Sequence, residues 1–108
     1  MQHDRLIAEI NEAYAKLEET AEALATADRE HAEHVRRVKI DNADAILKAK
    51  NERTERLYVA GLLDSGEHRR LEEAKTRAEL DHQHARHEVE RLRLLVRLVA
   101  APIPMGSA

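Results

Sequence analysis

An apolar residue recurs at alternating steps of four and three along the first half of this chain. From His3 to Ala49, ten of the fourteen positions on this ladder are apolar. A 3.5-residue repeat held over so many turns predicts helices that wind around each other in a left-handed coiled coil. Inside the ladder, Asp28, His31 and Asn42 are the polar exceptions. Polar residues at such positions usually fix the register or the oligomer state.

The composition favours long helices over a globular core. The 108 residues include 18 Ala and 13 Leu but no Cys, Trp or Phe, and 36% of all residues are charged. This mixture is typical of coiled coils. The lack of Cys excludes a disulfide framework and thiol catalysis. We therefore expect an all-α protein of the cytoplasm, with no signal peptide and no membrane span.

Two local signals divide the chain into three predicted helices. Asn51 and Thr54 can each accept a free backbone N–H, so a short helix is expected to begin there. Asp64 and Glu67 have the spacing of a capping box, which would begin the last helix, and Gly66 would ease the turn. We expect a single domain over residues 1–101, with helices at about 3–50, 54–63 and 66–100 and a disordered tail at 102–108.

The two long helices are expected to form an elongated antiparallel hairpin with the short helix at its tip. Neither long helix has enough apolar surface to be stable alone, so we also expect a homodimer or a larger homo-oligomer. The residues predicted for the hairpin and oligomer seam are Ile7, Ile10, Tyr14, Leu17, Leu24, Val35, Val38, Leu92, Val96 and Val99.

The position of the tip decides which residues face each other. With the break between the first two predicted helices, His31 and His34 would lie level with Asp81 and His84. If the first helix instead continues to Leu63, the same histidines would face the Leu-rich end of the last helix. We favour the first register, because Asn51 and Thr54 supply a break.

The stretch DHQHARHE, residues 81–88, raises the question of a metal site. His84 shares a helix face with His87 and Glu88, and Asp28 or His31 of the first helix could complete a tetrahedral set. A solvated helix face is the interpretation that we favour, so no metal ligand and no cofactor is assigned. A pH-sensitive seam at His31 is the second alternative, since a protonated imidazole there would disfavour assembly.

Nothing in the sequence indicates catalysis. It contains no nucleophile elbow, P-loop or glycine-rich dinucleotide fingerprint. Two long helices with Ala-rich seams also leave no obvious concave site for a substrate. We expect no enzymatic activity and assign no catalytic residue.

Charge is distributed unevenly, although the net charge is only −3. Residues 1–30 hold eight acidic and three basic residues, whereas residues 31–60 hold five acidic and seven basic residues. A basic hairpin tip can bind nucleic-acid phosphates even when the whole chain is negative. The predicted phosphate contacts are Arg36, Arg37, Lys39, Lys48, Lys50, Arg53, Arg56, Arg69 and Arg70.

Residues 37–98 are predicted to begin with a basic, Ala-rich helix that ends in a lysine-containing break. A Thr-x-Arg-like segment, a short helix and a long Ala- and Leu-rich helix are expected to follow in that order. The residues that carry this pattern are Ala43, Leu47, Lys50, Thr54, Arg56 and Leu92. In this order of segments the chain resembles small phage-encoded helical proteins related to the UvsY-type recombination mediators. The resemblance implies single-stranded DNA binding and oligomeric assembly beside a recombinase, in the cytoplasm of a host cell. This chain differs from that group in its net negative charge and its acidic first helix.

Two functions are therefore predicted. The first is a phage-type accessory protein that binds single-stranded DNA or acts as a recombination mediator. The alternative is a protein-interaction module, such as a scaffold, an assembly factor or a small inhibitor of a host protein. This module would dock through its acidic first helix or through the Leu-rich end of its last helix.

Overall fold

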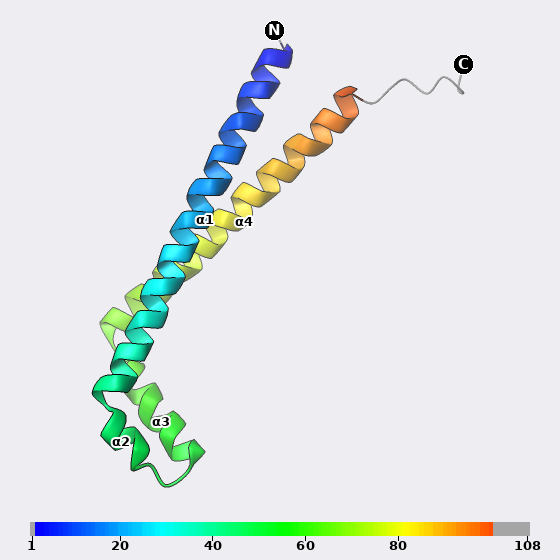
Figure 1. The fold of residues 1–108 in the computed structure, drawn as a ribbon. Helices are drawn as coiled ribbons and strands as arrows, with labels where there is room; N and C mark the ends of the chain where they lie inside the picture. Colours follow the sequence, from blue (N-terminus) through cyan, green and yellow to red (C-terminus); the bar gives the residue numbers. More distant parts are fainter. Residues whose placement is uncertain (1, 101–108) are drawn as a thin grey trace. The chain divides into compact units, whose positions relative to one another are not determined.

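The computed structural model describes residues 2–100, and the regular structure in this range is helical. The four helices are α1 (Gln2–Asp41), α2 (Ala43–Leu47), α3 (Glu52–Leu63) and α4 (Gly66–Ala100) (Figure 1). The predicted all-α fold is confirmed. No helix in the described range is long and apolar enough to cross a membrane. The tail that was predicted to be disordered, 102–108, lies outside the described residues.

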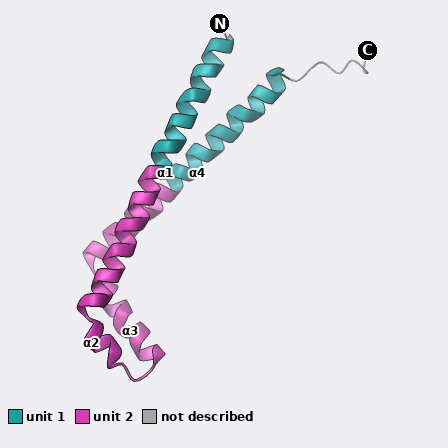
Figure 2. Cartoon of the chain, in the orientation of Figure 1, with its two compact units in different colours: residues 1–21, 80–108 teal, residues 22–79 magenta. Residues whose placement is uncertain are grey.

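The chain divides into two compact units, and both take one segment from α1 and one from α4 (Figure 2). Of the described residues, unit 1 comprises 2–21 and 80–100, and unit 2 comprises 22–79. Within each unit, the two segments lie side by side and run in opposite directions, as expected for a helical hairpin (Figure 1). In unit 2, for example, Asp28 pairs with Lys75 while the later His34 lies near the earlier Glu67.

Unit 1 has a small apolar core between its α1 and α4 segments. The buried members are Ala13, Val89 and Leu92. Leu6, Ile10, Leu17 and Leu95 pack around them and are only partly buried. Leu92 is 2% exposed and forms the centre of this core.

The buried stripe of α1 keeps the predicted 3.5-residue period but differs in its positions. It consists of Leu6, Ile10, Ala13, Leu17, Thr20, Leu24, Ala27, His31, His34 and Val38, with Val35 half-buried beside it. Every second predicted position is therefore shifted by one residue, so that Ala13 replaces Tyr14 and Ala27 replaces Asp28. Small side chains at these positions let the two helix axes come close.

Because of this shift, only some of the predicted seam residues are buried or half-buried within the single chain. Leu92 is buried, and Ile10, Leu17, Leu24, Val35, Val38 and Val96 are half-buried. Ile7, Tyr14 and Val99 are exposed and lie outside the packed stripe. Burial of these three residues in an oligomer stays a prediction.

The first helix ends earlier than predicted, at Asp41 rather than near residue 50. At Asn42 the backbone leaves helical geometry, and the side-chain Nδ2 donates to the Val38 carbonyl at 2.8 Å. The short α2 follows, and it contacts α3. Asn42 was interpreted as a polar seam position, and the structure corrects this, because the residue marks the break between α1 and α2.

The two predicted helix starts have different outcomes. Asn51 is confirmed as the N-cap of α3, because its Oδ1 accepts the Thr54 backbone N–H at 2.9 Å. The prediction of a capping box between Asp64 and Glu67 is wrong. The Oγ of Ser65 accepts the His68 backbone N–H at 3.1 Å, so Ser65 performs the capping role at the start of α4.

The predicted register is also wrong. His31 faces His68 and Glu72 of α4, instead of lying level with Asp81. The physical reason is that α2 and α3 contact each other, whereas the prediction extended the first helix through the residues of α2. The α4 residues that face each α1 position are therefore earlier in the sequence than expected.

Candidate functional site

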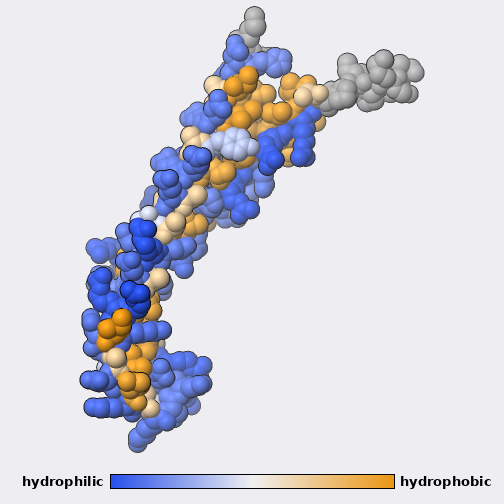
Figure 3. Space-filling view, viewed as in Figure 1, coloured by the Kyte–Doolittle hydropathy of each residue, from blue (hydrophilic) through white to orange (hydrophobic). Residues whose placement is uncertain are grey.

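Unit 1 carries an apolar groove between its two helix segments. The groove has a volume of about 340 Å³ and is lined by Ile10, Ala13, Tyr14, Val89, Leu92, Arg93, Val96 and Arg97. Hydrophobic surface is visible over these segments in Figure 3. Large apolar side chains also remain exposed in this unit, with exposed fractions of 56% for Ile7, 44% for Tyr14 and 58% for Val99. The intrachain contact thus uses Ala13 and leaves the larger Tyr14 in solvent.

The two helix segments of unit 1 carry opposite charges. Residues 2–21 of α1 contain five acidic and two basic residues, whereas residues 80–100 of α4 contain three acidic and four basic residues. Arg93 and Arg97 belong to the groove. Glu9, Glu12 and Glu19 of α1 line a separate hollow, together with Lys16 of α1 and Glu88 of α4. Basic and acidic surfaces therefore lie within the same unit.

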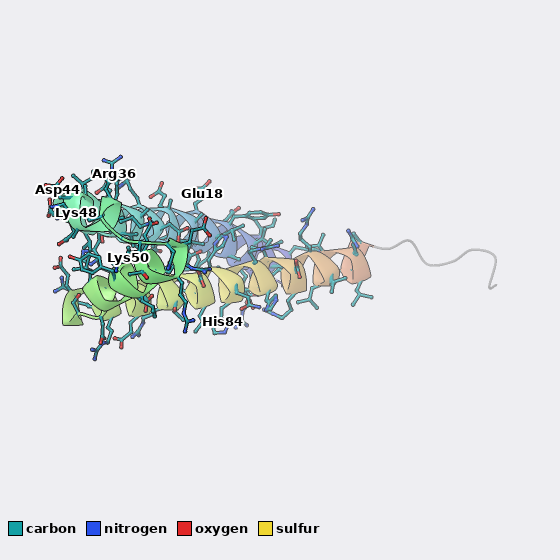
Figure 4. All side chains as sticks on the ribbon, turned by 90° about the horizontal axis from the view of Figure 1, so that it is seen from below. Glu18, Arg36, Asp44, Lys48, Lys50 and His84 are labelled. Atoms are coloured by element: carbon teal, nitrogen blue, oxygen red, sulfur yellow. The ribbon has the colours of Figure 1, made fainter. Side chains whose placement is uncertain are left out.

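All nine residues predicted to contact phosphates belong to unit 2, and all nine are exposed. Within residues 2–100, Arg69 is the one member of this basic set with a carboxylate partner, at 2.9 Å from Asp64. Arg36 projects outward from α1, and Lys48 lies at the same end of unit 2 as Asp44 (Figure 4). Six acidic residues are interspersed along the same stretch, namely Asp41, Asp44, Glu52, Glu55, Asp64 and Glu67.

The DHQHARHE stretch is split between different environments. His84 and His87 are exposed, and His84 projects outward from α4 (Figure 4). Glu88 is held by Arg91, with Nη2–Oε1 at 2.6 Å and Nε–Oε2 at 3.0 Å. This hydrogen bond lowers the pKa of Glu88 and raises the pKa of Arg91. The carboxylate that was considered as a metal ligand is therefore engaged by a guanidinium group.

His82, by contrast, contacts the other helix. Its Nδ1 lies 3.1 Å from the Oγ1 of buried Thr20. The Thr20 hydroxyl donates to the Leu17 carbonyl at 3.0 Å. A hydroxyl has one hydrogen, so His82 must donate from Nδ1 to the Thr20 oxygen.

A second group of histidines lies inside unit 2, between α1 and α4. We call His31, His34, His68 and Glu72 the histidine cluster. The His68 ring lies between the other two rings, with centroid distances of 5.1 Å to His31 and 5.5 Å to His34. The Nε2 atoms of His68 and His31 lie 3.0 Å and 4.0 Å from the Glu72 Oε1.

Three ring nitrogens of the cluster are buried without a hydrogen-bond partner among the described residues. They are His31 Nε2, His34 Nε2 and His68 Nδ1. His34 and His68 are only 9% and 8% exposed. A buried polar atom without a partner costs about 1–3 kcal/mol. The cluster is thus an unusual feature for a helix seam that apolar residues could fill.

Sequence reasoning placed His31 and His34 against Asp81 and His84 and missed His68. A signal was present, since His31 and His34 are three residues apart and His68 and Glu72 are four apart. Both spacings put two side chains on one helix face. The incorrect register concealed it, because the match between these two pairs requires α1 to end at Asp41.

Comparison with known proteins gives no relative from which a function could be inferred. No family model, no curated protein and no solved structure matches this chain.

Proposed function

We propose that this protein is a helical interaction module that self-associates through the apolar groove of unit 1. The observation that supports this function is the exposure of Tyr14, which lines the groove, and of Ile7 and Val99 in the same unit. Large contiguous apolar patches are rare on monomeric proteins and usually mark an interaction site. The core of unit 1 is small, so covering these side chains would add substantially to its buried apolar area.

A second copy of the chain is the occupant that the charges favour. A two-fold contact places the same patch of each copy against the other, so the patch must be complementary to itself. Unit 1 meets this requirement, because Arg93 and Arg97 of one copy can approach the acidic α1 segment of the other. Such complementarity orients the two copies and disfavours other partners.

The test is the mass of the protein in solution, measured by sedimentation equilibrium over a range of concentrations. We expect the wild-type mass to rise to that of a dimer or a larger oligomer. Tyr14→Glu should shift the protein towards the monomer, because it places a charge at the groove. Tyr58→Glu is the matched control, since Tyr58 is also exposed but lies in unit 2.

Two outcomes would exclude the proposal. One is a monomer mass at every concentration. The other is an equal loss of association in Tyr14→Glu and Tyr58→Glu, which would mean that the groove is not the contact.

Nucleic-acid binding by unit 2 is the second candidate function. It is supported by the exposure of all nine basic residues and by the resemblance to UvsY-type mediators, which adds single-stranded DNA and a recombinase as possible partners. The interspersed acidic residues weaken the positive potential, so binding should be modest and should fall steeply with salt.

A salt-titrated binding assay with single-stranded DNA tests this candidate. The triple variant of Lys50, Arg53 and Arg56 to Ala should lose affinity. The control triple variant of Arg5, Lys16 and Arg86 to Ala removes the same charge from unit 1 and should retain it. Absence of binding at low salt, or an equal loss in both variants, would contradict it.

A further inference from the structure

We infer that His31, His68 and Glu72 form a binding site for a divalent transition metal of the zinc class. The site belongs to unit 2, whereas the proposed docking groove belongs to unit 1. It uses none of the residues of the DHQHARHE stretch.

The three donor side chains come from two helices. His68 and Glu72 are four residues apart on α4, so their side chains share a face. His31 approaches from α1, and its ring centroid lies 5.1 Å from that of His68. Because the donors come from two helices, a bound ion would connect α1 and α4 of unit 2.

The donor distances are close to those that a metal requires. One ligand atom from each of the three residues can be chosen so that all lie within 4.8 Å of one another. Donors on one tetrahedral ion, with bonds of about 2 Å, lie roughly 3.3 Å apart. The 3.0 Å and 4.0 Å distances from Glu72 Oε1 to the two imidazoles lie on either side of this value. Side-chain rotations on the order of 1 Å would bring the set together.

One donor nitrogen without a hydrogen-bond partner among residues 2–100, His31 Nε2, gives an independent reason for a ligand. His31 Nε2 has no hydrogen-bond partner in the described chain, although it points towards the Glu72 carboxylate. His68 is more than nine-tenths buried and directs Nε2 to the same oxygen. A metal ion would use the lone pairs of both nitrogens in a place where water has little access.

The donor types select the class of metal. Two imidazoles and one carboxylate are suited to zinc and similar transition metals, whereas magnesium and calcium prefer oxygen ligands. Three protein donors leave one tetrahedral position for water. Glu72 is exposed, so an ion can enter from solvent along its side chain.

The surroundings predict moderate rather than tight binding. Ligand histidines usually donate their second N–H to a carboxylate or a carbonyl, and loss of that contact weakens metal binding about 10–100-fold. The second nitrogen of His68, Nδ1, has no such partner among the described residues. His34 packs on the His68 ring at 5.5 Å and helps to orient it.

The experiment follows thermal unfolding of the metal-free full chain during titration with zinc chloride, with magnesium chloride as a hard-cation control. A ligand that binds the native state must raise the midpoint temperature, Tm. We expect zinc to raise Tm and magnesium to leave it unchanged. Cobalt(II) added in place of zinc should give the intense visible absorption of tetrahedral coordination.

Variants distinguish the cluster from adventitious zinc binding by surface histidines. Glu72→Gln and His68→Asn should abolish the zinc-induced rise in Tm or require at least about tenfold more zinc for it. His84→Asn and His87→Asn remove exposed histidines and should keep the full rise. Glu72 is exposed, so Glu72→Gln keeps the test decisive even if His68→Asn does not fold.

The inference is overturned if zinc does not raise Tm. It is also overturned if Glu72→Gln responds like the wild type, or if His84→Asn and His87→Asn abolish the response. Tyr14→Glu should keep the zinc response while it loses self-association. The failure of one proposal is therefore distinguishable from the failure of the other.

Discussion

Thr20 and the histidine cluster both place polar side chains between helices, but they differ in whether the polar atoms have hydrogen-bond partners. The Thr20 hydroxyl is buried, but it donates to Leu17 and accepts from His82, so its hydrogen-bonding capacity is used. His34 and His68 are also buried, but they leave ring nitrogens without a partner among the described residues. A satisfied polar contact can fix the register of a helix pair, whereas an unsatisfied one destabilises it unless a ligand compensates.

Ser65 gives the first prediction at this scale. Ser65→Ala should lower the free energy of unfolding by about 1 kcal/mol, because the His68 N–H loses its side-chain acceptor. Asp64→Ala is the neighbouring control. It removes an exposed ion pair with Arg69, which is worth roughly 0.3 kcal/mol. Urea unfolding of both variants measures the difference, and a larger loss in Asp64→Ala would restore the capping box that the sequence suggested.

Glu88 and Arg91 give the second prediction. The hydrogen bond from Arg91 lowers the pKa of Glu88, so Arg91→Ala should raise that pKa towards its ordinary value. Because the pKa of Glu88 is lowered in the folded protein, the pair stabilises the folded state at pH values above the pKa of Glu88 in the unfolded chain. This stabilisation is lost as the pH falls through the folded pKa. An NMR titration of the Glu88 side chain measures the shift, and Arg86→Ala should leave it unchanged because residues two apart do not share a face.

The helices differ in how well the sequence predicts them. The 3.5-residue period of α1 was predictable, and so was α4, because both depend on repeated apolar spacing. The exact stripe was not, since a ladder through Ile7 and Tyr14 and one through Leu6 and Ala13 have the same period in the sequence. Close helix packing selected the smaller Ala13, which hydrophobicity alone does not reveal.

The connection between the long helices was predicted least well, for a physical reason. Neither α2 nor α3 has a buried residue, so no apolar stripe marks them in the sequence. Their ends depend on local hydrogen bonds, at Asn42 and at the Asn51 cap. Weak local signals of this kind rarely fix a boundary to within two residues. The same weakness concealed the histidine cluster, whose assembly depends on where α1 ends.

Absence of a buried core also predicts the dynamics of α2 and α3. Segments with few buried contacts open locally at low free-energy cost. We therefore expect the amide hydrogens of α2 and α3 to exchange faster than those of α1 near Ala13 and Thr20. Native-state hydrogen exchange measures this order. Protection of α2 and α3 that equals protection of the unit 1 core would contradict it.

A substitution at Gly61 can change the stability of α3 without creating new side-chain contacts. A Cβ at Gly61 would meet no atom within 4 Å, and no glycine of the described range has a positive φ. Gly61→Ala should therefore strengthen α3 by roughly 0.5–1 kcal/mol, which slows amide exchange in α3 about two- to fivefold. Exchange in the unit 1 core is the internal control and should stay unchanged.

At the scale of the whole molecule, fewer apolar residues are buried than large apolar side chains are exposed. Only five apolar residues of the described range are buried, and three of them are alanines. Ten large apolar side chains are exposed, from Ile7 near one end of the chain to Val99 near the other. We therefore propose that association contributes to the stability of this chain, because the entropy of ordering long helices needs a matching burial of apolar surface.

The last prediction follows from this dependence on association. If assembly contributes to folding, Tm should increase with protein concentration, because mass action favours the associated native state. Circular dichroism melts over about a hundredfold range of concentration measure the effect. Tyr14→Glu should have a lower Tm that no longer depends on concentration, whereas Tyr58→Glu should keep the wild-type dependence. A concentration-independent Tm in the wild type would mean that the small core of Ala13, Val89 and Leu92 is sufficient for a folded monomer, and that the exposed apolar groove has another purpose.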